Sequence, residues 1–172
     1  MEKVTVLDNL LPNETNLDIL NALADHPCWE IAKDQANECK LNRITQQPTG
    51  FLLKSVHEGM IEQPGNLILY SKIIFDIVNS KIKFKKFKLN RVYWNLYTPV
   101  AFPNEHQDNE KDNFTSIIYN PHTTDGGTII DGKFYQDVMG QAKIFKSNVL
   151  HKGVAPKKDL ARFNLNIVIE HS

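Results

Sequence analysis

Two segments in the first half of the chain carry apolar residues at intervals of three and four, which places them on one face of a helix. The first segment follows Pro12 and ends before His26-Pro27, because the residue before a proline avoids helical backbone angles. We expect Thr15 and Asp18 to form a capping box at its start. Its apolar positions are Leu17, Leu20, Leu23 and Ala24.

The second helical segment follows Pro64-Gly65, and we expect it to end at Asn79. Its apolar positions are Leu67, Tyr70, Ile73, Ile74, Ile77 and Val78. Residues 4–6 alternate apolar with polar side chains and predict a short strand ahead of the first helix. Residues 29–62 show no clear period, and we expect one or two strands and a loop there.

From Leu89 onward the pattern changes to short alternating runs separated by turn residues, which is typical of an antiparallel jelly roll. The runs are residues 91–97, 114–119, 128–130, 142–145 and 162–169. The sequence therefore predicts a mainly β fold with supporting helices and a double-stranded β-helix (jelly-roll) core. We expect a single domain over 1–172, with helical support over about 1–88 and the core over about 89–172.

Charge and composition narrow the functional classes. The chain has 20 basic and 20 acidic residues, so its net charge does not favour binding to nucleic acid. It contains no apolar stretch near the roughly 20 residues that cross a bilayer and no apolar leader, so we expect no membrane partner and a cytoplasmic protein, or one of the host cytoplasm if its source is viral. The oligomeric state has no signature in the sequence.

Residues 81–88 alternate lysines with Ile82 and Phe84, and this run has two interpretations. Lysines along a sheet edge block pairing with other chains, whereas interleaved bases and aromatic rings can bind single-stranded nucleic acid. We favour the protected edge.

The most informative chemistry lies in a His-x-Asp triplet and a later histidine. His106 and Asp108 are two residues apart, so on an extended segment their side chains point the same way while Gln107 points away. His151 would have to come from another strand that returns beside the first. Two imidazoles and one carboxylate form a face that leaves metal positions open, an arrangement suited to non-haem Fe(II).

The last predicted strand carries a cation and two amides on one face. Arg162, Asn164 and Asn166 share that face by the period of two, and the apolar residues between them face the other way. This pattern indicates a lined cavity. A guanidinium binds a carboxylate through two charge-assisted hydrogen bonds, so Arg162 is the expected anion anchor, with Lys157 and Lys158 as the next candidates.

These residues resemble the 2-oxoglutarate-dependent Fe(II) oxygenases, and within them the prolyl 4-hydroxylase-like branch. The likeness runs over about residues 90–169, with a further match near the N-terminus. Its pieces, besides the four residues above, are residues 7–12, 91–97, 116–120, 126–128 and 142–145.

The resemblance implies roles for individual residues. His106, Asp108 and His151 would bind Fe(II), and Arg162 would pair with the distal carboxylate of 2-oxoglutarate. Tyr97 lies nine positions before His106, where relatives carry a tyrosine that contacts this co-substrate, and Asn166 is a second neutral donor. Three further residues are weaker candidates for substrate binding: Tyr93, Asn95 and Asn164.

The implied activity is hydroxylation of an unactivated C–H bond with 2-oxoglutarate and O₂ as co-substrates, release of succinate and CO₂, and ascorbate as a candidate stimulant. Peptidyl proline is the first choice of substrate, and residues 33–62 are the expected lid over a peptide. Alternatives are a hydroxylase of a free amino acid or small metabolite, a cupin-like metal enzyme that does not use 2-oxoglutarate, and a jelly-roll binding module without catalysis.

Overall fold

The computed structural model describes residues 4–31, 50–62 and 65–171, which form two antiparallel sheets and two helices. The large sheet has eight strands. In spatial order they are β1 (Val4–Leu7), β9 (Gln141–Lys146), β6 (Phe114–Asn120), β11 (Arg162–His171), β5 (Phe87–Tyr97), β3 (Phe51–His57) and β2 (Glu30–Ile31), with β4 (Met60–Ile61) paired to β3. The small sheet has the order β10 (His151–Val154), β7 (Gly127–Ile130) and β8 (Lys133–Gln136).

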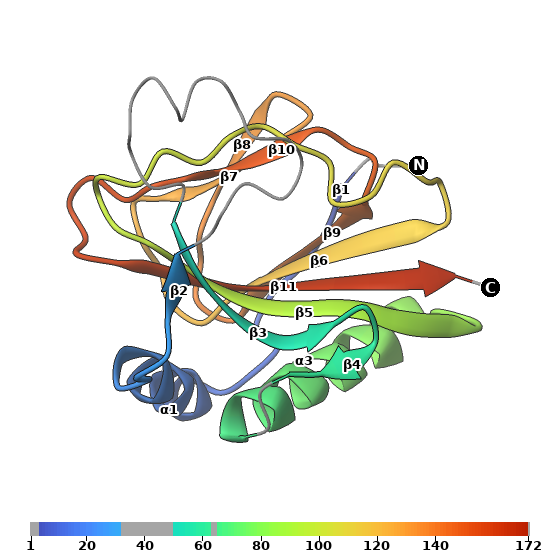
Figure 1. Ribbon diagram of the computed structural model, residues 1–172, viewed down its shortest axis with the longest axis horizontal. Coiled ribbons are helices and arrows are strands. Elements are labelled where there is room, and N and C mark those ends of the chain that lie inside the picture. The colour runs from blue at the N-terminus through green and yellow to red at the C-terminus, as the bar shows by residue number, and fades with distance from the viewer. Residues whose placement is uncertain (1–3, 32–49, 63–64, 172) are drawn as a thin grey trace.

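The two sheets and the helices form layers (Figure 1). Helices α1 (Asn13–Ala24) and α3 (Asn66–Ile82) lie on one face of the large sheet, and the small sheet lies on the opposite side. The strand pairing and this layering confirm the predicted mainly β, jelly-roll fold with supporting helices. No helix among the described residues is long and apolar enough to span a membrane.

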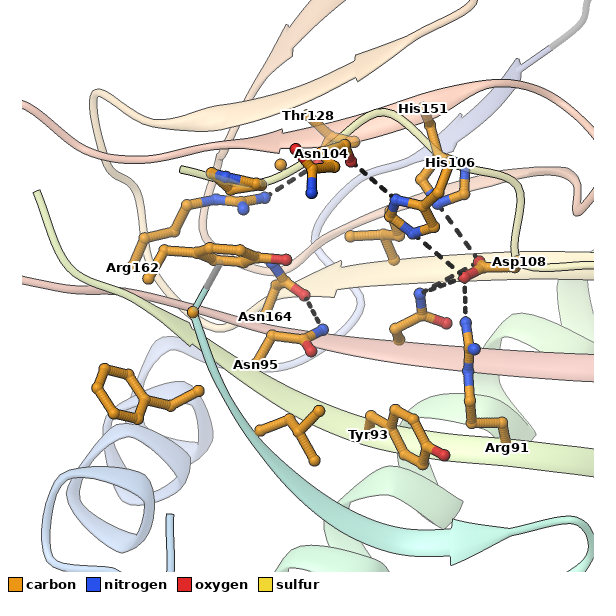
Figure 2. Close-up of a pocket in the computed structure, with 18 of the residues that line it drawn as sticks. Arg91, Tyr93, Asn95, Asn104, His106, Asp108, Thr128, His151, Arg162 and Asn164 are labelled. Carbon is orange, nitrogen blue, oxygen red and sulfur yellow. Dashed lines mark hydrogen bonds and ion pairs between the residues drawn. The ribbon is translucent and has the colours of Figure 1, made fainter. Parts of the chain in front are cut away.

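The alternation of β5 and β11 separates a hydrophobic core from a polar interior. Trp94 of β5 and Leu165 and Ile167 of β11 are fully buried against the helices. Their neighbours Asn95 and Asn164 point to the other side of the sheet, toward the small sheet (Figure 2). The predicted separation of apolar and polar faces on the last strand is therefore confirmed.

Helix α3 is attached to the sheet by a buried polar chain as well as by apolar packing. The Trp94 indole N–H donates to Ser71 Oγ at 3.0 Å, and Ser71 Oγ donates to the Leu67 carbonyl at 2.8 Å. The helix runs three residues beyond the expected end at Asn79, and Lys83 closes it in the left-handed conformation, with a φ of 59°. The apolar period continues through Ile82, which explains the longer helix.

The start of α1 differs from its prediction. The helix begins at Asn13 with Pro12 at the N-cap and no side-chain capping bond, so the predicted capping box of Thr15 and Asp18 is wrong. The N-cap backbone of Pro12 has a φ of −58°, an angle that its ring favours. The buried face also differs, because Leu17 is exposed and Ile19 is fully buried.

Two further expectations need correction. Residues 81–86 are not a sheet edge, because they comprise the end of α3 and a turn, whereas Phe87 and Lys88 begin β5 and pair with His171 and Glu170 of β11. Of the expected lid at 33–62, residues 50–62 include β3 and β4 of the large sheet, so a lid over that part is wrong. Residues 33–49 lie outside the described residues.

A buried polar contact fastens α1 to β6. The Tyr119 hydroxyl donates to Asn16 Oδ1, and the Asn16 amide nitrogen donates to the carbonyls of Leu11 at 3.3 Å and Pro12 at 3.2 Å. Both side chains are fully buried. Burial raises the pKa of Tyr119 far above its usual value, although the bond to Asn16 opposes this shift, so the phenol stays protonated.

We expect Tyr119→Phe to lower the free energy of unfolding by about 1–3 kcal/mol, because it leaves a buried amide oxygen without a donor. Urea denaturation with an unchanged slope would measure this loss. Tyr135→Phe is the matched control on β8 and should change the free energy by less than about 0.5 kcal/mol. Equal stability of Tyr119→Phe and the parent protein would contradict a structural role for the contact.

Candidate metal centre

Backbone pairing brings the two candidate histidine ligands together. His106 and His151 form an isolated antiparallel bridge, in which each backbone N–H donates to the other residue's carbonyl at 2.9 Å. The Asp108 N–H donates to the Ser147 carbonyl at 3.0 Å, which holds the next part of the same segment. The expectation that His151 returns beside the His-x-Asp segment is confirmed.

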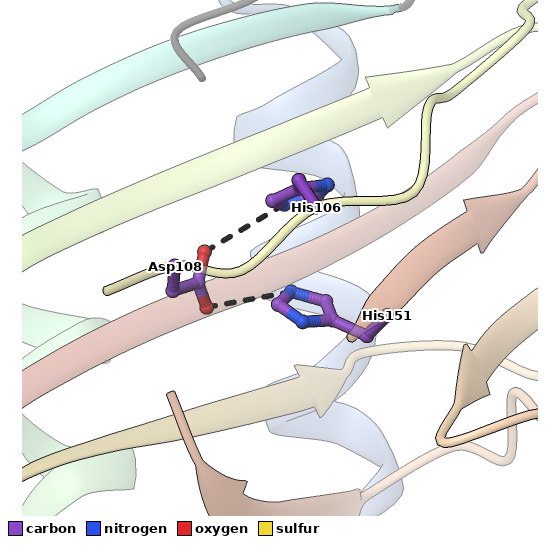
Figure 3. Close-up of side chains that lie close together, drawn as sticks. All are labelled: His106, Asp108 and His151. Carbon is purple, nitrogen blue, oxygen red and sulfur yellow. Dashed lines mark ion pairs between the residues drawn. The ribbon is translucent and has the colours of Figure 1, made fainter. Parts of the chain in front are cut away.

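The three side chains converge on one point (Figure 3). Potential ligand atoms of His106, Asp108 and His151 all lie within 4.8 Å of one another. The carboxylate oxygens of Asp108 lie 3.7 Å from His106 Nε2 and 3.5 Å from His151 Nε2, so neither pair is at ordinary hydrogen-bond distance. This spacing leaves room for an ion between the three groups.

The orientation of both imidazoles suits metal binding. Nδ1 of His106 lies 2.9 Å from the Asn104 carbonyl, and Nδ1 of His151 lies 2.9 Å from the Val149 carbonyl. A carbonyl only accepts, so each Nδ1 carries the proton and each Nε2 presents a lone pair to the site. His151 Nε2 is buried and has no hydrogen-bond partner among the described residues. A metal ion would satisfy this orphaned atom.

Asp108 is held as an ionised carboxylate by several donors. Arg91 forms an ion pair with its Oδ1, Ser116 donates to Oδ2 at 2.6 Å, and the Asn166 amide donates to Oδ2 at 3.2 Å. Burial would raise the pKa of Asp108, but the charge of Arg91, with contributions from His151 and His106, overcomes it and holds the pKa well below its usual value. The carboxylate is therefore charged and fixed in direction.

The two histidines differ in their affinity for protons. Burial lowers the pKa of His151, which favours the neutral imidazole that a metal needs. Burial also opposes protonation of His106, but the neighbouring Asp108 carboxylate outweighs it and raises the pKa of His106. A divalent cation between these groups would take the place of that proton.

A pocket of about 290 Å³ extends from this centre to Arg162 (Figure 2). Its walls come from the inner faces of β5, β11, β6, β7 and β10 and from β3. Ile118 of β6 lines it, whereas Ser116, two residues earlier on the same strand, contacts Asp108. Gly153 of β10 also lines it, and a Cβ at Gly153 would lie 3.0 Å from the Tyr97 ring and 3.2 Å from Arg162 Nη1. The glycine therefore keeps space open beside the guanidinium.

Arg162 is fully buried at the far end of the pocket from Asp108. Its Nε donates to Asp137 Oδ2 at 2.5 Å, and its Nη2 donates to Asp137 Oδ1 at 3.3 Å and to Thr128 Oγ1 at 2.9 Å. The guanidinium carbon lies 4.9 Å from the Tyr97 ring centroid, a cation–π contact. Burial raises the pKa of Tyr97, and the Arg162 charge opposes this, so the phenol is neutral.

The other candidate residues separate into two groups. Asn95 and Asn164 pair with each other at 2.9 Å, and the Asn164 side-chain amide also lies 3.1 Å from Nη1 and Nη2 of Arg162. Asn166 lies at the metal end, where it bonds Asp108, and not beside Arg162. Tyr93 also lies toward the metal end, where its hydroxyl contacts His57.

Lys157 and Lys158, the alternative anion anchors, are exposed. Neither lysine is among the residues that line the pocket. Their backbone N–H groups donate to the Asp125 carboxylate at the surface. Of the three candidate anion anchors, Arg162 is the one that lines the pocket.

Sequence reasoning missed Arg91, Asp137 and Lys143. Arg91 opens a predicted strand, and its period-two relation to Tyr93 and Asn95 could have placed it in the pocket. Asp137 follows β8 and Lys143 lies within β9, where a lysine between apolar residues looks like a solvent-facing position. No sequence signal marks these two as buried.

Comparisons with known proteins identify the fold but rest on structure alone. No protein-family model matches the sequence, and no curated protein matches it. A 2OG-Fe(II) oxygenase family oxidoreductase from Burkholderia pseudomallei superposes with a TM-score of 0.72 at 11% identity, covering 98% of this chain and 85% of that one.

Two other solved structures have the same fold. The viral collagen prolyl hydroxylase of Paramecium Bursaria Chlorella virus-1, solved as a 2OG complex, matches with a TM-score of 0.64 at 15% identity over 99% of this chain and 97% of that one. The non-heme alpha ketoglutarate dependent epimerase SnoN from nogalamycin biosynthesis matches with a TM-score of 0.71 at 9% identity, over 98% and 78%. The predicted resemblance to the 2-oxoglutarate/Fe(II) oxygenases is thus confirmed at the level of fold.

We expect His106→Ala and His151→Ala each to weaken Mn(II) binding by more than about 100-fold, since loss of even a hydrogen-bond partner of a ligand typically costs 10- to 100-fold. Calorimetric titration under anaerobic conditions would measure the change. Removing Asp108 is a less specific test, because it also leaves Arg91 without its carboxylate. His26→Ala, outside the pocket, is the control, and an unchanged affinity in His106→Ala would exclude it as a ligand.

Proposed function

We propose that the protein is a 2-oxoglutarate- and Fe(II)-dependent dioxygenase that hydroxylates an unactivated C–H bond, with release of succinate and CO₂. One observation carries the proposal. A single pocket combines, at one end, a His-Asp-His face with a buried orphan imidazole nitrogen and, at the other, a buried guanidinium. The oxygenase fold of the structural neighbours supports the same conclusion.

Each end of the pocket suits one part of the co-substrate. His106, Asp108 and His151 would hold the metal, which supplies the redox chemistry with O₂ when bound. Three protein ligands leave open positions for the 2-oxo acid end. Arg162 would pair with the distal carboxylate, because a carboxylate buried without a partner costs several kcal/mol.

The remaining residues would orient the co-substrate and restrict water. The Tyr97 phenol is neutral and lies over Arg162, so it can donate a hydrogen bond without repelling a carboxylate. Asn95 and Asn164 supply amide groups between the two ends. Because Asp108 would occupy the third ligand position, a halide would find no vacant protein position, and we propose hydroxylation in preference to halogenation.

For the substrate we propose peptidyl proline, with a free amino acid or small metabolite as the alternative. The structural likeness to a viral collagen prolyl hydroxylase and the Tyr97-to-His106 spacing support the first choice. The likeness to an epimerase of nogalamycin biosynthesis, which has also been solved in complex with nogalamycin RO, keeps the alternative open.

A coupled assay tests the proposal. With Fe(II), ascorbate, O₂ and 2-oxoglutarate, we expect proline-containing peptides to gain the mass of one oxygen atom and to stimulate succinate release. Peptides that gain no mass, beside a small molecule that does stimulate succinate release, would replace the prolyl substrate but retain the oxygenase. If neither the protein alone nor any tested substrate gives O₂-dependent succinate, while the metal is bound, the oxygenase proposal is wrong.

Arg162→Ala should raise the apparent requirement for 2-oxoglutarate well over tenfold, because truncating one partner of a buried charge pair typically costs about 2–5 kcal/mol. Metal affinity should persist, since Arg162 makes no contact with the three metal-ligand candidates. Succinate release as a function of 2-oxoglutarate concentration measures the effect. Lys158→Ala, on the exposed segment before β11, is the control. An unchanged requirement in Arg162→Ala would place the anchor elsewhere.

A further inference from the structure

A cluster of three buried charges lies behind the far end of the pocket. Arg162 of β11, Lys143 of β9 and Asp137, which follows β8, each have side chains with no exposed area. Asp137 contacts both cations, with its Oδ1 3.3 Å from Lys143 Nζ and its Oδ2 2.5 Å from Arg162 Nε. Arg162 lines the pocket, while Asp137 and Lys143 lie behind it.

The pairing between Asp137 and Arg162 fixes how the guanidinium faces the pocket. Asp137 accepts from Nε and Nη2, the two donors of one edge of the fork. Thr128 accepts a further bond from Nη2. Nη1 does not bond Asp137. It lies beside Tyr97 and Gly153, and a Cβ added at Gly153 would lie 3.2 Å from it. The Nη1–Nη2 edge, which Asp137 does not use, lines the pocket, where the Asn164 side-chain amide lies 3.1 Å from both nitrogens, and this is the edge at which a ligand would bind.

The ion pair with Asp137 also neutralises the positive charge of Arg162, the expected anion anchor. A guanidinium that already carries a bidentate carboxylate has a net charge of zero as a pair, and a neutral pair attracts a second carboxylate weakly. Lys143 restores one positive charge, since its ammonium donates to Asp137 and to Asn120 Oδ1 at 2.6 Å. Burial lowers the pKa of Lys143, and the Asp137 carboxylate opposes this shift.

Other charges near the cluster do not replace Lys143. His122 is neutral and adds no positive charge, because burial lowers its pKa and its Nε2 accepts a hydrogen bond from the Phe163 N–H at 2.9 Å. Asp159 is exposed and Asp125 is half-buried. The Asp125 carboxylate accepts from the backbone N–H groups of Lys157 and Lys158, and the Asp125 N–H donates to Asp159 Oδ2 at 2.9 Å. Lys143 is thus the buried cation, among the described residues, that contacts the Asp137 carboxylate with Arg162.

We propose that Asp137 and Lys143 are positioning residues of the co-substrate site: Asp137 sets the orientation of the Arg162 guanidinium, and Lys143 restores the positive charge that Asp137 cancels. This inference rests on the proposed function and deepens it, because it assigns selection for a carboxylate at the far end of the co-substrate to a three-residue cluster. Arg162 contacts the ligand, and the other two act through Arg162.

Lys143→Met tests the charge with little change in side-chain length. In anaerobic calorimetric titrations of the Mn(II)-loaded protein, we expect its Kd for 2-oxoglutarate to rise at least about tenfold, because the anchor becomes neutral. The Kd for 2-oxobutyrate, a 2-oxo acid without the distal carboxylate, should stay within about twofold, since that ligand makes no use of the anchor. Lys146→Met, at the exposed end of the same strand, is the matched control.

A compensating double variant separates charge from packing. Asp137→Asn with Lys143→Met removes one negative and one positive charge, so Arg162 alone again supplies a net positive charge. We expect the double variant to bind 2-oxoglutarate more tightly than Lys143→Met. A purely structural role predicts the opposite order, because two buried contacts are lost in place of one. Thermal unfolding establishes that each variant is folded, and Lys143→Gln serves in place of Lys143→Met if the latter is not.

The outcomes distinguish this inference from the function on which it rests. If the unaltered protein binds Mn(II) but not 2-oxoglutarate, both the proposed function and the inference are wrong. If the unaltered protein binds 2-oxoglutarate and Lys143→Met binds it equally well, only the inference is wrong. It is also wrong if Lys143→Met weakens 2-oxobutyrate and 2-oxoglutarate by the same factor, or if the double variant is no better than the single one.

Discussion

The pairing of β11 between β5 and β6 determines the geometry of the whole site. Its register sets Arg162 opposite Tyr97, Asn164 opposite Asn95, and Asn166 opposite Tyr93 on one side, and Asn166 opposite Ile118 on the other. Because side chains alternate along a strand, a slip by one residue would turn these polar groups into the helix-facing core. The fully buried Leu165 and Ile167 oppose such a slip, since it would bring them into the polar pocket.

The interior between the two sheets is unusual in how much charge it buries. Asp108 and Arg91 form an ion pair at one end, and Asp137, Arg162 and Lys143 form a cluster of three charges at the other. Desolvation of such groups costs several kcal/mol per ion. Such groups contribute little net stability compared with apolar residues of similar size. Their retention in a pocket is better explained by ligand binding, because each cluster holds a charged group in one orientation beside the same cavity.

The sequence predicted the structure correctly wherever the spacing of apolar and polar residues within one segment determines it. The helices, most strands of the core, the shared direction of His106 and Asp108 and the polar face of Arg162 and Asn164 follow from spacings of two, three and four residues. His151 was a candidate through the resemblance to a known family and not through a local spacing. Contacts between distant segments could not be read in this way. Asn16 lies within a helical pattern yet is buried against Tyr119, and Lys143 has the local pattern of a surface lysine. Their environment depends on sheet order, which no local signal encodes.

The central claim is that one pocket holds a metal at His106, Asp108 and His151 and the distal carboxylate of 2-oxoglutarate at Arg162. A crystal structure of the protein with Mn(II) and 2-oxoglutarate, grown without oxygen, tests it most directly. The account predicts Mn(II) ligated by the Nε2 atoms of both histidines and by the Asp108 carboxylate, with Arg162 bound to the distal carboxylate. Metal bound at other residues, or a co-substrate whose distal carboxylate lies away from Arg162, would contradict it.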